Sequence, residues 1–355
     1  MRFSLGTFVR KRRSSPSSAS AGAAAALGVL VTVALTFFGL LLVTFLIGRV
    51  VPIDPVLAAV GDRAPAEVYE RVRQELGLDL PLWRQFYLYA IKAVQGDFGR
   101  SVLTSNPVVA DIARYFPATL ELATIATIIG VAFGVPLGVL AAVHRDRWID
   151  QAVRVVGLVG YSVPVFWLGL VGLMLFYANL GWVAGPGRLD VAYDDLVETV
   201  TGVILIDSAL AREWDVFRNA FAHVILPASI LGYFSLAYIS RMTRSFMLEQ
   251  LRQEYITTAR VKGLSERRVV WRHALGNVMV PLVTVVALSY ANLLEGSVLT
   301  ETVFAWPGLG QYITNSLLNA DMNAVLGGTV VVGVVFTGLN LLSDVLYRIL
   351  DPRAR

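Results

Sequence analysis

Four ionisable side chains fall within long apolar segments of this 355-residue chain: Glu121, Arg154, Glu295 and Asp344. A charge at membrane depth is costly, so such residues are functional candidates. All four lie near segment ends, where a side chain can reach the membrane surface or cap a helix, and we assign that simpler role to Glu121, Arg154 and Asp344. Glu295 differs because polar residues precede it in the same segment: Ser289, Tyr290 and Asn292. This cluster fits a polar path and an ordinary helix contact equally well.

The chain lacks the sequence patterns of several chemistries. It has no phosphate-binding loop of the form GxxxxGK(S/T) and no HExxH, GxSxG or Rossmann glycine pattern. Cysteine is absent, and the three histidines lack metal-ligand spacing: His144, His223 and His273. No pair of catalytic groups at membrane depth is evident, which argues against an intramembrane enzyme. If ATP drives a process here, another chain must hydrolyse it.

The composition is that of a membrane protein. Apolar residues make up 56% of the chain and the mean hydropathy is +0.63, which leaves too little charge for a soluble surface. The formal net charge of +4 would suggest a nucleic-acid partner in a soluble protein. Here the cations sit mostly beside apolar segments, where topology and membrane lipid explain them, and we expect no nucleic-acid partner.

Six apolar segments approach the roughly 20 residues that a spanning helix needs. They cover residues 27–47, 117–142, 153–180, 223–240, 276–298 and 324–347. Six spans place both termini on one side of the membrane. The segments richest in Lys and Arg predict that this side is cytoplasmic; they are the N-terminal tail and residues 144–151, 241–272 and 348–355. The acid-rich segment 181–220 fits the other side.

These assignments predict five parts of the chain. Residues 1–24 combine basic residues with a Ser/Ala run, and we expect a disordered cytoplasmic tail followed by a first transmembrane helix at residues 25–48. Residues 49–116 carry amphipathic spacing and are expected to form an extracytoplasmic helical segment. Residues 117–350 form a core with five further spans, and residues 351–355 are a cytoplasmic C-terminus.

Glycine and proline mark a seam between spans. One segment carries a glycine every four residues, at Gly130, Gly134 and Gly138. That spacing lets a neighbouring helix approach closely. Pro164 follows Tyr161 and Ser162 and removes a backbone hydrogen bond, which a span tolerates where protein or a water-filled cavity surrounds it. Each feature alone is typical of packing or kinking; together they favour a conformational seam, and we place Tyr161, Ser162 and Pro164 on a candidate path.

The strongest local pattern lies in the basic loop 241–275, within YITTARVKGLSERRVVWRHALGNVMVP at residues 255–281. One acid, Glu266, accompanies five basic residues: Arg260, Lys262, Arg267, Arg268 and Arg272. Tyr255, Ile256 and Ala259 predict an apolar stripe on a short helix beside a cationic face.

The residues after this stripe predict how the short helix ends. Gly263 follows two basic residues, the order expected where a helix ends in a left-handed residue. Ser265 can cap the next helix. A short helix outside the bilayer, held by spans at both ends, suits a lever for a cytosolic partner. A topology anchor or a contact with anionic lipid explains the charge equally well.

This loop resembles the coupling loop of ABC-transporter membrane subunits, in the form found in bacterial dipeptide and oligopeptide importer permeases. The family motif is EAA followed by a glycine, and its matching positions here are Thr257, Thr258, Ala259 and Gly263. Leu275 and Gly276 stand at the later Leu-Pro, with Pro281 further on. Other stretches resemble the same branch: GDFGRSV from Gly96, FPATLELA from Phe116, YSVPVFWLGL from Tyr161, LGWVAGPGRLD from Leu180, AHVILPA from Ala222, ETVFAWPGLGQ from Glu301 and the terminal LDPRAR.

The resemblance implies an all-α polytopic protein of the bacterial cytoplasmic (inner) membrane, with six transmembrane helices in the type I ABC importer permease fold. It implies four kinds of partner: a second homologous permease, two cytosolic ATPases that use ATP and Mg²⁺, an extracytoplasmic solute-binding protein and membrane lipid. No cofactor is expected on this chain. The ATPase contact would consist of Tyr255, Thr257, Thr258, Ala259, Arg260, Lys262, Gly263, Ser265, Glu266, Arg267 and Arg268.

The solute is open at this stage. The leading hypothesis is a path for di- or oligopeptides lined by Tyr161, Ser162, Pro164, Ser289, Tyr290, Asn292 and Glu295. Members of the family also handle nickel chelates, glutathione, haem, opines or oligosaccharides. A secondary transporter is a further alternative, which would predict buried charge pairs or repeated halves around broken helices, and the sequence gives no sign of either.

Overall fold

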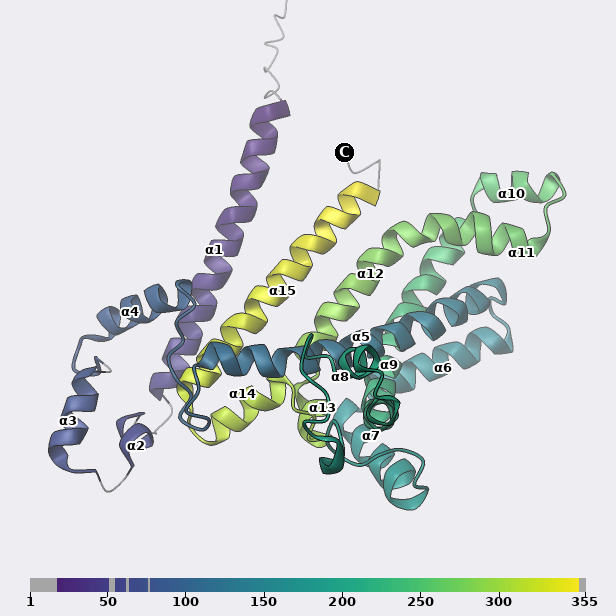
Figure 1. Cartoon of the computed structure of the whole chain (residues 1–355). Helices are drawn as coiled ribbons and strands as arrows, with labels where there is room; N and C mark the ends of the chain where they lie inside the picture. The colour runs from purple at the N-terminus through teal and green to yellow at the C-terminus, as the bar shows by residue number, and fades with distance from the viewer. Residues whose placement is uncertain (1–17, 51–54, 62–63, 76, 351–355) are drawn as a thin grey trace, which may run out of the picture.

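The computed structural model describes residues 18–50, 55–61, 64–75 and 77–350, which form a bundle of helices (Figure 1). The helices are α1 (Ser18–Val50), α2 (Pro55–Val60), α3 (Ala66–Glu75), α4 (Leu82–Val94), α5 (Val108–Val143), α6 (Trp148–Ser162), α7 (Val165–Gly172), η1 (Leu173–Asn179), η2 (Val191–Tyr193), α8 (Ile204–Ala211), α9 (Trp214–Gln250), α10 (Glu254–Val261), α11 (Glu266–Arg268), η3 (Val269–Ala274), α12 (Leu275–Gly296), α13 (Val298–Val303), α14 (Leu309–Leu318) and α15 (Met322–Leu350). Because the elements of these described residues are all helices, with no β-strand among them, the all-α prediction is confirmed.

Five helices in the described part of the chain are long and apolar enough to cross a membrane. They cover Leu27–Gly48, Val108–Val143, Trp214–Gln250, Glu266–Gly296 and Met322–Ser343. Helices α6 and α7 with η1 pass the same test only as a pair and are bent by 98° at the break between them. With this bent pair counted as one span, the prediction of six spans is confirmed.

The third predicted span is a broken helix. We expected one continuous apolar segment over residues 153–180, whereas α6 ends at Ser162 and α7 begins at Val165. Val163 adopts an extended conformation with φ −94° and ψ 128°, and Pro164 occupies the N-cap of α7. A residue that precedes proline disfavours the α-helical region, because its backbone clashes with the proline ring. The proline therefore bends the chain more sharply than the kink we predicted.

Several helices extend beyond the apolar segments that predicted them. Helix α5 begins at Val108, so the predicted boundary at residue 116 lies inside it, and α9 extends past residues 223–240 at both ends. Helix α1 already begins at Ser18, within the predicted tail, where the sequence is rich in alanine, the strongest helix former. The predicted C-terminus at residues 351–355 and residues 1–17 lie outside the described residues.

Helices α5 and α9 form the centre of the bundle, and the glycine pattern explains how closely they approach. A Cβ atom added at Gly130 would lie 2.5 Å from the Ser235 hydroxyl oxygen, and one at Gly138 would lie 2.6 Å from the Ser240 carbonyl oxygen. These distances are below van der Waals contact, so a side chain would push the helices apart. The predicted close helix approach at Gly130, Gly134 and Gly138 is confirmed.

Figure 1 shows how the ends of the helices are arranged. The start of α1, the end of α15 and the pair α10 and α11 lie toward one end of the molecule. Helices α2, α3, α13 and α14 lie toward the opposite end, and α4 lies beside α1. The bundle therefore carries two separate groups of short helices, one at each end of its spans.

Candidate coupling segment and translocation path

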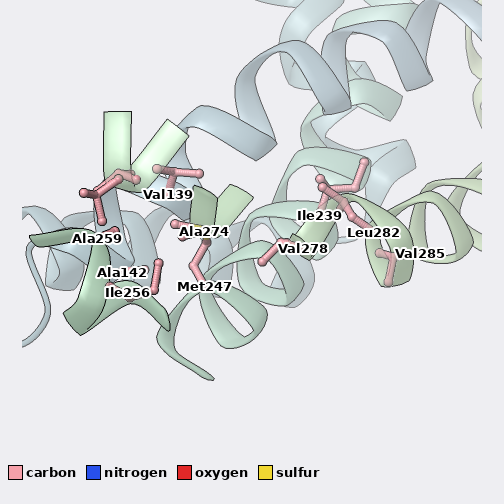
Figure 2. Close-up of a cluster of buried hydrophobic side chains, with 12 residues drawn as sticks. Val139, Ala142, Ile239, Met247, Ile256, Ala259, Ala274, Val278, Leu282 and Val285 are labelled. Carbon is pink, nitrogen blue, oxygen red and sulfur yellow. The ribbon is translucent and has the colours of Figure 1, made fainter. Parts of the chain in front are cut away.

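The candidate coupling segment, residues 254–268, begins with a short helix, α10, that rests on the bundle by one narrow face. Ile256 and Ala259 of α10 are buried in a cluster with residues of α5, α9, η3 and α12. Figure 2 labels these two residues together with Val139, Ala142 and Met247 of the same cluster. Because residues three apart share one helix face, this contact fixes the rotation of α10 about its axis.

The predicted apolar stripe contained one residue too many. Tyr255 is 37% exposed, and its hydroxyl donates a hydrogen bond to Oε1 of Gln250 over 2.8 Å. Successive helical residues are about 100° apart around the axis, so Tyr255 lies about 100° from Ile256 but about 40° from Ala259, at the edge of the buried face. The fully buried part of the stripe narrows to Ile256 and Ala259.

The turn after α10 has the geometry that the sequence predicted. Gly263 has a φ of +78°, a left-handed conformation that strains other residues, and its N–H donates to the Arg260 carbonyl oxygen over 2.9 Å. Ser265 occupies the N-cap position of α11, but its side chain makes no capping hydrogen bond. An exposed ion pair between Arg260 and Glu266, with 2.8 Å between Nε and Oε1, joins the two helices across the turn.

The side of the segment turned away from the bundle is exposed and mostly polar. It consists of Thr257, Thr258, Arg260, Val261, Lys262, Gly263, Ser265, Glu266, Arg267 and Arg268. Val261 differs from its polar neighbours on this surface, because its apolar side chain is 83% exposed beside Lys262. Sequence reasoning did not single it out, although its position between two basic residues argues against a buried role.

An ion pair that the sequence did not predict holds the same end of the bundle together. Asp150, at the start of α6, is fully buried, and its carboxylate accepts hydrogen bonds from Nε and Nη2 of Arg244 over 2.6 and 2.7 Å. Arg244 lies on α9, 94 residues away in sequence. No local pattern could have paired them, because the pairing depends on how α6 packs against α9.

Two of the predicted path residues contact neighbouring positions of α9. Tyr161, at the end of α6, packs against Phe234 with 5.2 Å between ring centroids. The neighbouring residue Ser235 shares a buried hydrogen bond of 2.8 Å with Ser289 of α12. Since Phe234 and Ser235 are adjacent in α9, their side chains point about 100° apart, and Tyr161 and Ser289 contact different faces of that helix.

Other path residues differ in exposure and in their contacts. The hydroxyl of Tyr290 lies 3.1 Å from that of Thr124 on α5, within hydrogen-bond distance. Asn292 and Glu295 are exposed on α12. Glu295 also lines a small cavity of about 20 Å³ with residues of α5 and α15. Ser289 and Tyr290 therefore take part in helix contacts, whereas Asn292 and Glu295 present their side chains on an open face.

Tyr161 has a charged neighbour that the sequence did not reveal. The guanidinium carbon of Arg241 lies 5.0 Å from the centre of the Tyr161 ring and 5.7 Å from that of Tyr238. Both distances are within the range of a cation–π contact. Ser162 next to the ring is exposed, and Pro164 lies at the break itself. The bend between α6 and α7 thus carries an aromatic ring with a cation over its face.

Glu121 is a buried ion-pair partner, which corrects the interpretation as a helix-end residue. Its side chain is almost fully buried, Nη2 of Arg188 lies 2.5 Å from its Oε2, and Oε1 accepts the Leu205 N–H over 3.0 Å. The prediction was wrong because α5 begins at Val108, well before the apolar segment, and the loop before α8 covers the residue. The side chain of Asp344 lies outside the described part.

Glu301 in the motif ETVFAWPGLGQ is a second buried carboxyl group that sequence reasoning passed over. It accepts hydrogen bonds from the Thr119 hydroxyl over 2.7 Å, the Ser297 hydroxyl over 3.0 Å and the Gln311 N–H over 3.0 Å. Burial raises the pKa of Glu301 above its ordinary value, and these hydrogen bonds oppose that rise. The carboxyl group therefore organises the turn between α13 and α14.

The comparison with protein families identifies the class of protein. Residues 134–355 match the family described as binding-protein-dependent transport system inner membrane component, and residues 26–123 match the corresponding N-terminal family. The chain belongs to this family and is a multi-pass membrane protein. It is the membrane permease component of such a transport system and not its ATPase.

Individual relatives are similar over most of their length. The chain is 45% identical to the probable D,D-dipeptide transport system permease protein DdpB of Escherichia coli, over 89% of this chain and 92% of that protein. It is 44% identical to the di/tripeptide transport system permease protein DppB of Pseudomonas aeruginosa, over 90% and 95%. A structure of the MetNI methionine ABC transporter in an inward-facing conformation has a TM-score of 0.52 at 20% identity, covering 70% of this chain and all of that one. This last match supports the permease fold.

Proposed function

We propose that this chain is one of two homologous permease subunits that together form the path of an ATP-driven importer for di- or oligopeptides. The similarity to permeases named for D,D-dipeptide and di/tripeptide transport supports this cargo. Two cytosolic ATPases, using ATP and Mg²⁺, and an extracytoplasmic solute-binding protein complete the importer. Nickel chelate, glutathione, haem, opine and oligosaccharide are the alternative cargoes.

The observation that carries the proposal is the geometry of α10. Its buried face belongs to one apolar cluster with residues of α5, α9, η3 and α12, while its other side stays exposed next to a left-handed glycine. A displacement of α10 is therefore transmitted through this cluster to three spans. ATP-driven closure of the ATPase pair moves α10, and the spans rock as packed units between inward and outward openings.

The proposed orientation places α10, α11 and both termini in the cytoplasm. The exposed surface of the coupling segment holds Arg260, Lys262, Arg267 and Arg268 against Glu266. Positive charge next to spans favours the cytoplasmic side. The opposite end, with the segment between α7 and α9, then faces the solute-binding protein.

The structure also bears on the secondary-transporter alternative. Contrary to the sequence expectation, it contains buried charge pairs, Glu121–Arg188 and Asp150–Arg244, and a broken helix at Pro164. Each pair fixes a loop or a helix end to the bundle and leaves the centre of the spans without paired charge among the described residues. This arrangement, together with the family match, favours the importer.

A matched pair of valine substitutions tests the coupling segment. Val261 on α10 is 83% exposed, and Val191 in the segment proposed to be extracytoplasmic is 86% exposed. Burying a valine side chain in a partner's groove contributes about 1.5–3 kcal/mol, so Val261→Glu is expected to weaken ATPase binding about tenfold or more. Val191→Glu, the control, is expected to leave it unchanged. The measurement is the amount of ATPase that co-purifies with the tagged chain, and equal amounts in the two variants would refute the proposed contact.

Substitution of Gly263 tests the same contact in another way. A Cβ at this position meets no atom of the described chain within 4 Å, and only the left-handed backbone opposes a side chain, at about 1–2 kcal/mol. Gly263→Trp is therefore expected to insert into the membrane normally and to lose the ATPases. Normal co-purification of the ATPases with this variant would contradict the lever model.

Reconstitution tests the cargo. In liposomes that contain the complete importer and its binding protein, a labelled dipeptide should accumulate only when ATP is present. The chain reconstituted alone should move no solute. Uptake by the chain alone would contradict the importer model, and ATP-dependent uptake of a nickel chelate or an oligosaccharide without uptake of dipeptide would replace peptide as the cargo.

A further inference from the structure

A cavity of about 310 Å³ lies between α1, the region of α3 and α4, and the start of α15. Its lining comprises Phe45, Gly48, Glu75, Gly77, Leu78, Gln85, Leu88, Tyr89, Lys92, Asp97, Phe98, Gly99, Met322, Asn323 and Leu326. It is separate from the coupling segment and shares no residue with the candidate path. Nothing in the transport mechanism accounts for it.

The position of the cavity relative to the spans sets its depth in the membrane. Gly48 is the last residue of the first span and Met322 is the first residue of the last one. These spans are neighbours, because Leu40 of α1 packs over Gly333 of α15. The cavity thus opens where two adjacent helices leave the hydrocarbon, which is the level of the lipid headgroups on the face opposite α10.

The cavity combines both signs of charge with apolar walls. Lys92 of α4 supplies a cation, and Glu75 and Asp97 supply carboxylates. None of these three residues forms an ion pair with another described residue. The site therefore offers a cation and two carboxylates to a ligand that carries opposite charges of its own.

Gln85 adds a hydrogen-bond acceptor that lacks a partner among the described residues. Its Nε2 donates to the carbonyl oxygens of Leu80 and Leu78 over 2.7 and 3.4 Å, which fixes the amide. Its Oε1 is buried and accepts no hydrogen bond from the described part of the chain. A buried acceptor without a donor is unfavourable, so the site suits a ligand that brings an N–H group.

We propose that this cavity binds the headgroup of a zwitterionic phospholipid with a primary ammonium group, of the phosphatidylethanolamine type. Lys92 pairs with the phosphate, and Glu75, Asp97 and Gln85 Oε1 receive the ammonium. The acyl chains run along the apolar surface of α1, where Phe38 is 53% and Leu46 is 47% exposed. A free dipeptide carries similar charges but would not use the apolar surface that continues from the cavity into the membrane.

Lipid competition in native mass spectrometry tests the proposal on the delipidated, fully assembled complex. The probes are short-chain phosphatidylethanolamine, phosphatidylcholine and phosphatidylglycerol at equal concentrations. Phosphatidylcholine has the same charges but no N–H donor, and phosphatidylglycerol has no cation, so ethanolamine lipid is expected to bind about tenfold more tightly than either. Equal retention of the three lipids would overturn the proposal.

Charge variants locate the bound lipid. Lys92→Glu is expected to lower retention of the ethanolamine lipid about tenfold, whereas Arg84→Glu, an exposed charge reversal on the same helix outside the cavity, should leave it unchanged. The double change Glu75→Gln with Asp97→Asn should reduce the preference for the ethanolamine lipid over phosphatidylglycerol. The backbone N–H of Gly99 donates a hydrogen bond to Oδ1 of Asp97, and the asparagine side chain keeps an oxygen that can accept it. Equal losses in the Lys92 and Arg84 variants, or displacement of the lipid by millimolar alanyl-alanine, would contradict a lipid site.

Discussion

Gly138 lies where α5 and α9 touch closely, and replacing it by alanine should separate the two helices. An added Cβ would lie 2.6 Å from the Ser240 carbonyl oxygen and 2.6 Å from Cβ of Thr243. A carbon atom normally stays at least about 3.3 Å from a carbonyl oxygen, so the helices must move apart by about 0.7 Å. Overpacking of this kind destabilises by about 1–3 kcal/mol. Thr243 precedes Arg244, so the displacement also strains the ion pair with Asp150.

The assay compares the thermal unfolding of Gly138→Ala with that of Gly157→Ala. At Gly157 on α6 the nearest atom to an added Cβ is 3.9 Å away, an ordinary contact. Both variants gain about 1 kcal/mol of helix propensity, so the difference between them isolates the clash. The expected difference in melting temperature is about 2–4 °C for each kcal/mol. Equal melting temperatures, together with ATPase coupling like that of the wild type, would refute the close approach.

Three further substitutions test other parts of the structure. Arg188→Met leaves the Glu121 carboxylate buried without its cation, and a loss of about 3–5 kcal/mol is expected in thermal unfolding; an unchanged midpoint would mean that the pair is solvated. Gly308→Ala places a Cβ closer to the Glu301 carboxyl group than van der Waals contact allows, so thermal unfolding is expected to show a loss of about 1–3 kcal/mol of stability. A variant as stable as the wild type would contradict the tight turn. Glu295→Ala is expected to lower peptide uptake while leaving the melting temperature unchanged, because the carboxylate is exposed on α12. Uptake like that of the wild type would remove Glu295 from the path.

The sequence predicted the features that depend on local chemistry. The left-handed turn at Gly263 was predicted from the residues that precede it, and the structure has it. The close approach at Gly138 followed from glycine spacing alone. Helix ends were less accurate, as at Val108, because a helix continues through polar turns that hydropathy does not count as span.

The sequence did not predict partners that lie far apart along the chain. Hydropathy places Glu121 at a helix end, yet Arg188 in a loop 67 residues later pairs with it. Asp150 and Arg244 meet only because α6 packs on α9. A buried charge must be paired, but composition does not say which of many arginines supplies the pairing.

By itself, the sequence determined that this is a helical membrane protein with a short helix between two spans, because apolar length, charge asymmetry and the glycine turn act over neighbouring residues, and its resemblance to a known family added the role of a permease. Only the tertiary structure decided that Tyr255 is partly exposed at the edge of the buried face, that the third span bends by 98° at Pro164, and that Tyr161 and Ser289 contact different faces of α9. Those outcomes depend on how helices rotate and pack against one another. Periodicity along one helix fixes which residues share a face, but the neighbouring helices decide which face is buried.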